Sequence, residues 1–314
     1  MIEKKILVLE GGFNEEHEVS IETGSQVKKA LKNLNISFES LIVNPKNFKN
    51  KISKYENNLI CFNALHGTFG EDGGIQKILD DLSFKYTHSG SDASKKGFNK
   101  ELTKKEIINT EIKTLPSFTL EIKELTEDIL YDSFRKFGSF IIKPISSGSS
   151  YGINIFKDKN SINLFLTDFK KNKNIYANHS QILIEKFING RELTVAVLDF
   201  DSISVPIDVT EIIIDREFFD YKSKYTPGFA KHVLPANLPN KDYDVCKAYA
   251  KIAHDKINCE GVSRSDFIYD DKDVYFLEIN TQPGLTPMSL VPEQLKFKKI
   301  NFEKMLMFIL ESVK

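Results

Sequence analysis

Residues 262–280 read VSRSDFIYDDKDVYFLEIN, and this stretch sets the first expectations for the fold and the site. Two segments rich in apolar and aromatic residues flank a polar centre at 271–273, which is typical of a β-hairpin. If Lys272 is the centre of the loop, the numbers of facing residues sum to 544. This register pairs Asp266 with Glu278 and Arg264 with Asn280.

The paired positions predict a cluster of polar side chains on one face of the hairpin, because directly opposite residues and residues two apart share a face. Two facing carboxylates, about 5 Å apart at Cβ, repel each other unless a cation lies between them. Carboxylate and amide oxygens suit Mg²⁺. The alternative is a solvated outer face on which Arg264 offsets one acid. The opposite face would enter the core through Phe267, Leu277 and Ile279.

The N-terminal third predicts a small doubly wound α/β unit. Residues 5–9 form an apolar run that ends at two glycines, and 18–34 have helical spacing. Further apolar runs at 40–43 and 59–65 and a helical pattern at 74–82 follow. Ligands gather at the loops after the carboxyl ends of such strands. Those loops here are Gly11–Ser20 and His66–Gly74, whereas 44–58, rich in Lys and Asn, is expected to be a solvated surface.

Past residue 95 the pattern becomes mixed. The sequence predicts a helix at 99–112, a strand at Phe140–Lys143, and strands at 182–187 and 192–199 linked by a turn at Asn189-Gly190. A long polar and aromatic loop, 214–240, is interpreted as a lid, with a disordered linker as the alternative. The aromatic residues that favour a lid are Phe218, Phe219, Tyr221 and Tyr225.

Composition and charge exclude several classes of protein. Lys and Arg total 43 against 44 Asp and Glu, a net charge of -1, so bulk charge does not hold this chain to nucleic acid or to an anionic membrane. The three cysteines, Cys61, Cys246 and Cys259, form no C-x-x-C pattern and are expected to be buried and unpaired. We find no signal segment and no membrane span, and we expect a cytoplasmic protein.

Three weaker signals lie outside the hairpin. The turn Ser146–Gly152 follows Lys143 and is suited to cradle a phosphate, or is simply a flexible loop. Glu185-Lys186 ends an apolar strand and is suited to hold a base edge, or is where the strand meets solvent. His66 is a catalytic candidate, or a hydrogen-bonded histidine at a strand end. The hairpin acids, the phosphate turn and several scattered lysines together predict a nucleotide–Mg²⁺ site.

The order of motifs resembles the D-alanine–D-alanine ligases, a family with the ATP-grasp fold. The matching segments run nearly end to end. They are Glu10-Gly-Gly with Glu16-His-Glu-Val-Ser20, Leu65–Gly73, Lys143-Pro through Gly152, Glu185–Glu192, Phe218–Tyr225, Arg264-Ser-Asp266 and Glu278–Ser289.

The resemblance implies a fold that is α/β and α+β, with a Rossmann-like (doubly wound) N-terminal domain followed by an ATP-grasp pair. The expected domains are 1–90, which is α/β and binds substrate, a central subdomain at 91–184, and a C-terminal subdomain at 185–314 that carries the lid. The implied reaction joins two D-alanines for peptidoglycan synthesis. ATP phosphorylates one carboxylate, and the amine of the second D-alanine attacks the acylphosphate.

Residue roles are implied by the same resemblance. The ATP-binding residues would be Lys100, Lys143, Ser149, Glu185, Phe187, Glu192 and Lys224, with Glu185 and Glu192 reading adenine and ribose and the backbone near Phe187 also contacting adenine. Two Mg²⁺ ions, for which Mn²⁺ is a substitute, would be held by Asp266, Glu278 and Asn280. Arg264 and the Gly284 N–H would stabilise the tetrahedral oxyanion.

For the amino acids, the resemblance implies that Glu18 binds the first ammonium, with His66 beside the carboxylate. Ser149 and Tyr225 would complete a hydrogen-bonded group with Glu18. Ser289 and the Leu290 backbone would hold the second carboxylate. Tyr225 favours amide formation over ester formation. The alternatives are a ligase for another acceptor such as D-lactate or D-serine, and a non-catalytic nucleotide-binding relative.

The phosphate loop and the partners of the chain are the remaining expectations. The phosphate loop departs from the family pattern at Ile145–Ser147 and at Tyr151. We expect its backbone to cradle phosphate all the same, with a difference in ATP affinity or in loop packing. The partners would be D-alanine and ATP, with no nucleic acid and no membrane, in a homodimer.

Overall fold

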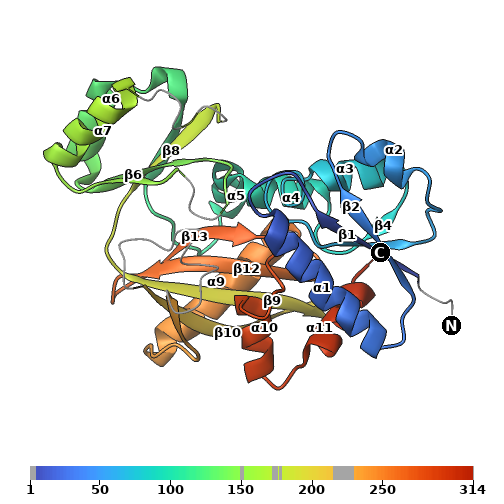
Figure 1. Cartoon of the computed structure of the whole chain (residues 1–314). Coiled ribbons are helices and arrows are strands. Elements are labelled where there is room, and N and C mark those ends of the chain that lie inside the picture. Colours follow the sequence, from blue (N-terminus) through green and yellow to red (C-terminus); the bar gives the residue numbers. More distant parts are fainter. Residues whose placement is uncertain (1–4, 149–151, 172–175, 177–178, 215–229, 314) are drawn as a thin grey trace.

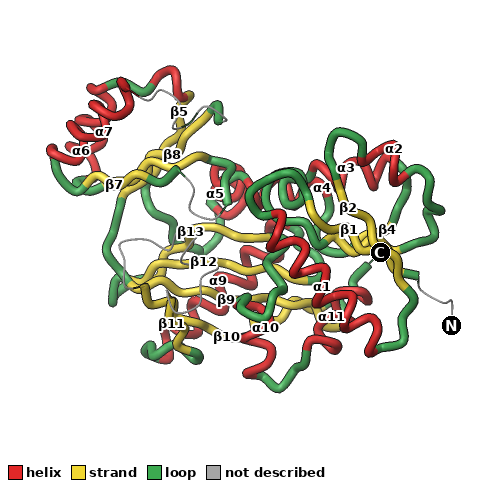
Figure 2. Tube along the Cα trace, in the orientation of Figure 1, coloured by secondary structure: helices red, strands yellow, loops and turns green. Residues whose placement is uncertain are grey.

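The computed structural model describes residues 5–148, 152–171, 176, 179–214 and 230–313 (Figure 1). Its strands form three sheets. Figure 2 shows them as separate layers, with the second sheet and its two helices standing away from the rest of the molecule.

The first sheet is wholly parallel and has the order β2-β1-β3-β4. Successive residues of β1 point to opposite faces: Ile6 and Val8 join one buried cluster, whereas Leu7 and Leu9 join another. The doubly wound unit is therefore confirmed. Its strands are β1 (Ile6–Gly11), β2 (Phe38–Val43), β3 (Ile60–Asn63) and β4 (Lys85–Tyr86), and its helices include α1 (His17–Asn33) and α3 (Gly74–Asp81).

The prediction of a solvated surface at 44–58 is wrong in part. Helix α2 (Phe48–Ile52) lies within it, and both Phe48 and Ile52 are fully buried. Two apolar residues four apart occupy one face of a single helical turn. The surrounding Lys and Asn residues hide so short an apolar pattern.

The second sheet is antiparallel and has the order β5-β8-β6-β7. Its strands are β5 (Ser117–Glu121), β6 (Phe140–Pro144), β7 (Asn154–Phe156) and β8 (Gln181–Lys186), and a 3₁₀ turn, η1, covers Ile122–Glu124. Helices α6 (Glu127–Phe137) and α7 (Lys159–Lys171) pack against it over an aromatic core in which the Phe140 and Phe156 rings stack at 4.6 Å. This leaves the side away from the helices for the cleft.

The third sheet is antiparallel and has the order β11-β10-β9-β12-β13. Val195 and Val197 of β9 pack with helix α9, whereas Ala196 and Leu198 pack with α10 and α11, so the sheet is buried on both faces. Its elements are β9 (Arg191–Phe200), β10 (Ile203–Ile214), β11 (Ala230–Val233), β12 (Val262–Tyr269), β13 (Val274–Asn280), α9 (Asn240–Ile257), α10 (Leu290–Phe297) and α11 (Phe302–Glu311).

The two strands linked by Asn189-Gly190 lie in different sheets. β8 belongs to the second sheet and β9 to the third, so residues 187–190 connect the two halves of the cleft. A Cβ at Gly190 would lie 2.5 Å from the Tyr269 carbonyl oxygen, so only glycine allows this close approach.

The expected lid at 214–240 is wrong in its extent. Residues 230–233 form β11, which pairs with the end of β10, and α9 begins at Asn240. Residues 215–229, which hold all four aromatic residues of that prediction, lie outside the described residues. The expected domain boundaries stay a prediction; β8 runs from Gln181 to Lys186 and therefore crosses the one at 184/185.

The three cysteines are buried and unpaired, as expected, and burial raises the pKa of each thiol to about 12. Within the described part of the chain, no helix combines the length and the apolar character that a bilayer crossing requires.

His88 is buried two residues after the end of β4, in a left-handed conformation with φ of 70°. Burial, with a smaller contribution from His66, lowers the pKa of His88 to about 3. The folded state therefore resists protonation, and its stability should fall as the pH drops below about 6.5, by about 1.4 kcal/mol per unit.

We expect His88→Asn, which tolerates positive φ, to flatten this dependence. Between pH 7.5 and 5.0 the wild type should lose about 2 kcal/mol more than the variant in urea unfolding. Equal losses in the two proteins would show that folding does not lower the pKa of His88, and the assignment would fail.

Candidate active site

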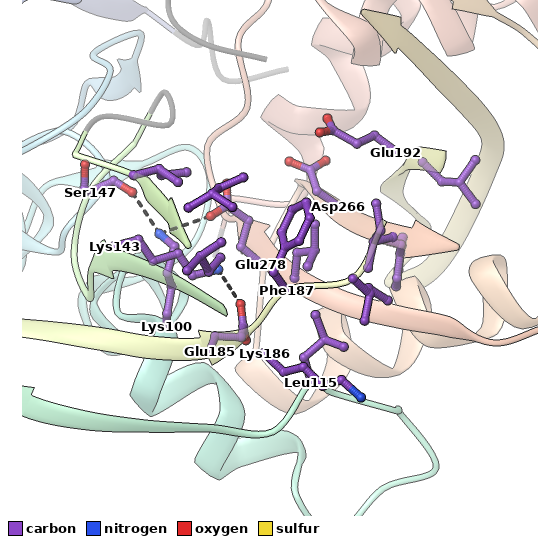
Figure 3. Close-up of a pocket in the computed structure, with 18 of the residues that line it drawn as sticks. Lys100, Leu115, Lys143, Ser147, Glu185, Lys186, Phe187, Glu192, Asp266 and Glu278 are labelled. Atoms are coloured by element: carbon purple, nitrogen blue, oxygen red, sulfur yellow. Dashed lines mark hydrogen bonds and ion pairs between the residues drawn. The ribbon is translucent and has the colours of Figure 1, made fainter. Parts of the chain in front are cut away.

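The candidate site is a cleft between the second and third sheets. One side comes from β6, β7 and β8 and the other from β9, β12 and β13, with residues 187–188 at the connection. Figure 3 shows the polar residues meeting across it: Lys100, Lys143 and Glu185 on one side, Glu192, Asp266 and Glu278 on the other.

Apolar side chains line the part of the cleft next to the connection. Ile155 comes from β7, Phe187 from the connection and Leu277 from β13. An apolar slot beside charged groups suits a purine base with attached phosphates.

The predicted register of the hairpin is confirmed at the end away from the turn, where the site residues lie. Arg264 faces Asn280, and Asp266 faces Glu278. A bulge between Asp266 and Phe267 shifts the remaining pairs by one, so Phe267 faces Phe276.

Because of this bulge, the prediction that Leu277 points into the core is wrong. Phe276 enters the core beside Phe267 and Ile279, and Leu277 lines the cleft instead. The bulge thus adds an apolar side chain to the face that carries the acids.

Each hairpin acid is held by a cation of the protein. Arg264 donates to both oxygens of Asp266, from Nε at 2.9 Å and from Nη2 at 2.8 Å. Thr194 Oγ1 also donates to Asp266, at 2.6 Å. Lys100 Nζ lies 3.1 Å from Glu278 Oε2. Arg264 therefore does offset one acid, as the alternative expects. The two acids nevertheless line a cleft and not a solvated outer face.

The donor set fits Mg²⁺. Asp266 and Glu278 offer carboxylate oxygens from facing positions, and Glu278 and Asn280 line a second hollow beside Lys100 and Gly148. These are the hard oxygen ligands that magnesium prefers, usually with phosphate and water completing the shell. Among the described residues no group of three or more His, Cys, Asp or Glu could hold a metal. Oxygen atoms of Asn280 and of a bound ligand would therefore have to complete the coordination shell of an ion here.

Lys100 is positioned by a capped helix. Asn99 accepts hydrogen bonds from the Glu101 and Leu102 N–H groups, which starts α5 (Lys100–Ile107) at Lys100. The Lys100 N–H donates to the Ile145 carbonyl, and its Nζ donates to the Ser147 carbonyl at 2.9 Å. The sequence predicts one helix at 99–112, whereas α5 ends at Ile107 and α4 (Ser91–Phe98) precedes it.

Glu185 is fully buried between two lysines. Lys143 Nζ donates to its Oε2 at 2.7 Å, and Lys104 donates to its Oε1. Burial raises the pKa of Glu185, but the charges of Lys143 and Lys104 outweigh burial and hold that pKa below its ordinary value. Lys104 carries no role in the sequence analysis, because nothing in its local pattern separates it from its exposed neighbour Lys105.

The other expected nucleotide contacts lie along the same connection. Glu192 and Phe187 line the cleft. The Phe187 N–H donates to the Ser139 carbonyl at 2.9 Å, so a backbone contact with adenine would fall to another group of this segment.

His66 is buried, and both ring nitrogens face protein groups. Nε2 lies 2.9 Å from Thr23 Oγ1, and Nδ1 lies 3.2 Å from Glu71 Oε1. This network fixes the ring at the carboxyl end of β3, where the sequence predicts a ligand loop.

The structure does not place Glu18 with these groups. Glu18 is exposed in the first turn of α1, whereas Glu16, directly before the helix, is buried. A Cβ at Gly67 would lie 2.5 Å from Glu16 Oε2, and one at Gly148 would lie 3.8 Å away. The Glu16 carboxylate is therefore the one that lies where the His66 loop meets the phosphate turn.

Gly284 and Ser289 are close together. A Cβ at Gly284 would lie 2.9 Å from Ser289 Oγ, which also accepts a hydrogen bond from the Thr286 N–H at 3.0 Å. Leu290 is buried at the start of α10. Gln282, to which the sequence analysis assigns no role, joins this loop to β3. Its Oε1 accepts a hydrogen bond from Asn63 Nδ2 at 2.6 Å.

Ser149, Tyr151, Lys224 and Tyr225 lie outside the described residues, so their roles stay predictions.

Comparisons with known proteins agree along the chain. Residues 120–311 match the family model described as "D-ala D-ala ligase C-terminus". The D-alanine–D-alanine ligase of Pelagibacter ubique is 40% identical over 98% of this chain and 97% of its own length. A crystal structure of the Bacillus anthracis D-alanine–D-alanine ligase complexed with ATP has a TM-score of 0.78 at 25% identity, covering 98% of this chain and 97% of that one. The VanG D-Ala:D-Ser ligase of Enterococcus faecalis has a TM-score of 0.79 at 25% identity, covering 98% of both.

Proposed function

We propose residue roles for one reaction, on the premise that the chain belongs to the D-alanine–D-alanine ligase family and has its ATP-grasp fold. It is an ATP- and Mg²⁺-dependent ligase that joins two D-alanines for peptidoglycan synthesis. The observation that carries the residue roles is the meeting of Asp266 and Glu278 with Lys100 and Lys143 in one cleft.

The first step transfers the γ-phosphoryl group to the carboxylate of one D-alanine. Two anions approach each other in this step, so positive groups must screen them. Lys100 and Lys143 would bind the nucleotide phosphates, with the adenine in the slot beside Phe187 and the ribose near Glu192. Magnesium, when bound by Asp266, Glu278 and Asn280, supplies further positive charge at the phosphate oxygens.

In the second step the amine of the other D-alanine attacks the acylphosphate carbon, and phosphate leaves. The tetrahedral intermediate carries an oxyanion. Arg264 and the Gly284 N–H would donate to it, and Ser289 with the Leu290 backbone would hold the second carboxylate. Ser289 Oγ lies against Gly284, which supports a single pocket for both tasks.

We assign the first ammonium group to Glu16 in place of Glu18. A buried carboxylate beside the loop of His66 suits the ammonium group of the first D-alanine. At an exposed carboxylate, the ammonium group would have to compete with water for the same oxygens. This change keeps the expected role and moves it by two residues.

Phosphate release with different acceptors is the measurement that discriminates between the candidate functions. With ATP and Mg²⁺, we expect D-alanine to support phosphate release and D-alanyl-D-alanine to form, and EDTA to abolish both. The fold does not choose the acceptor, since VanG, a D-Ala:D-Ser ligase, matches it as well as the Bacillus anthracis enzyme does. Turnover only when D-lactate or D-serine accompanies D-alanine would favour another acceptor, and no release with any acceptor would favour a non-catalytic relative.

We also propose a cytoplasmic homodimer. Three buried, unpaired cysteines support a reducing compartment, and the dimer rests on the family resemblance. Light scattering of the purified chain tests the dimer, and a mass of about 36 kDa, that of one chain, would refute it.

A further inference from the structure

Lys104 and Lys143 share one carboxylate but differ in position. Lys143, on β6, lines the cleft, and so does Glu185. Lys104, on α5, is mostly buried behind Glu185 and is not among the residues that line the cleft. The two ammonium groups therefore approach Glu185 from different elements, and one of them is on the nucleotide side.

The three N–H donors of Lys104 are all used within the protein. They donate to the Leu115 carbonyl at 3.0 Å, to Ser117 Oγ at 2.8 Å and to Glu185 Oε1. An ammonium group has three donors, so Lys104 is saturated. Among the described residues, Lys143 donates to Glu185 alone, which leaves it donors for a ligand.

The charges of this group do not cancel. One carboxylate and two ammonium groups leave a net charge of +1. With Lys104 absent, Glu185 and Lys143 would neutralise each other in a buried setting, and an anion would gain little from Lys143. We propose that Lys104 is a positioning residue that neutralises Glu185 and so leaves the charge of Lys143 for the nucleotide phosphates. This inference rests on the proposed role of Lys143 as a phosphate ligand.

The ionisation states are consistent with this arrangement. Burial lowers the pKa of Lys104, and the Glu185 charge opposes that shift. The pKa of Glu185 lies below its ordinary value. The carboxylate is therefore ionised at neutral pH and needs a partner whether or not nucleotide is bound.

Binding of ADP with Mg²⁺, compared with binding of adenosine, tests the proposal by calorimetry. Lys104→Met should weaken ADP binding about 10- to 100-fold, the effect of one charge-assisted hydrogen bond, and leave adenosine binding within about twofold. Lys104→Arg should restore most of the ADP affinity. Lys105→Met is the matched control on the same helix, because Lys105 is exposed and pairs with Glu101; it should change neither affinity.

A double variant separates charge balance from a structural role. In Lys104→Met with Glu185→Gln, Lys143 no longer has an anion to neutralise it. The affinity for ADP relative to adenosine should therefore be higher than in Lys104→Met alone, and any change in the contact with the base affects both ligands equally. Equal losses for ADP and adenosine in Lys104→Met would overturn the proposal, and so would a double variant whose ADP-to-adenosine affinity ratio is no higher than that of the single one. Lys104→Gln gives the same comparison if Lys104→Met does not fold.

Lys143→Met shows which assumption has failed. If it leaves ADP binding unchanged, the proposed phosphate role of Lys143 is wrong, and the inference falls with it. If Lys143→Met weakens ADP binding but Lys104→Met does not, the role of Lys143 stands and the inference about Lys104 is wrong.

Discussion

Replacing Arg264 by lysine should lower the rate of D-alanyl-D-alanine formation by about 10²- to 10³-fold, the usual cost of one oxyanion donor. The guanidinium group holds Asp266 by two parallel hydrogen bonds. A lysine carries the charge on a single nitrogen, so it cannot keep that bidentate contact while donating to a second anion. The loss should therefore appear in kcat at saturating ATP and D-alanine.

The controls must separate two effects of this substitution: loss of the donor to the oxyanion, and displacement of the Asp266 carboxylate that Arg264 holds. Arg135→Lys is a matched variant, because Arg135 is exposed on α6, and it should retain full activity. If raising Mg²⁺ restores the Arg264→Lys variant, the defect belongs to Asp266 as a metal ligand. A decrease in kcat of less than about threefold would reject the donor role.

The hairpin shows how a correct site can follow from an incomplete model of the strands. Counting from Lys272 gives the observed pairs Asp266–Glu278 and Arg264–Asn280. The turn itself is centred half a residue earlier, since Ile268 faces Tyr275, and the bulge restores the expected register at the site. A bulge leaves little trace in a pattern of alternating residues, so the prediction failed only at Leu277.

Strand and helix patterns were readable where the core imposes them. The run at 5–9 and the spacing at 18–34 became β1 and α1 because each buries a continuous apolar face. Which sheet a strand joins is a long-range property, so the split between β8 and β9 was not visible. The partnership of Lys104 with Glu185 spans 81 positions and needs the same tertiary information.

Charged residues in a motif are harder to assign, as Glu16 and Glu18 show. Both lie in one stretch, Glu16-His-Glu18, and the sequence does not say where α1 begins. In the structure Asn14 Oδ1 accepts from the Glu16 N–H at 3.1 Å, and α1 starts at His17. Residues two apart on a helix point in different directions, so the starting residue decides which carboxylate enters the site.

Glu16→Gln should therefore reduce kcat/KM for D-alanine by about 10²- to 10⁴-fold, because losing one partner of a buried ion pair costs about 3–5 kcal/mol. Glu18→Gln, with the same chemical change two residues away on an exposed face, should stay within about threefold of the wild type, as surface substitutions do.

Thermal unfolding of the two variants provides the stability control for this pair. Glutamine keeps the shape of the buried Glu16 side chain, so both variants should remain folded at the assay temperature while kcat/KM falls only in Glu16→Gln. The reverse ranking, in which Glu18→Gln is the damaged enzyme, would restore the assignment read from the motif. It would also mean that the junction of Gly67 and Gly148 is not where the ammonium group binds.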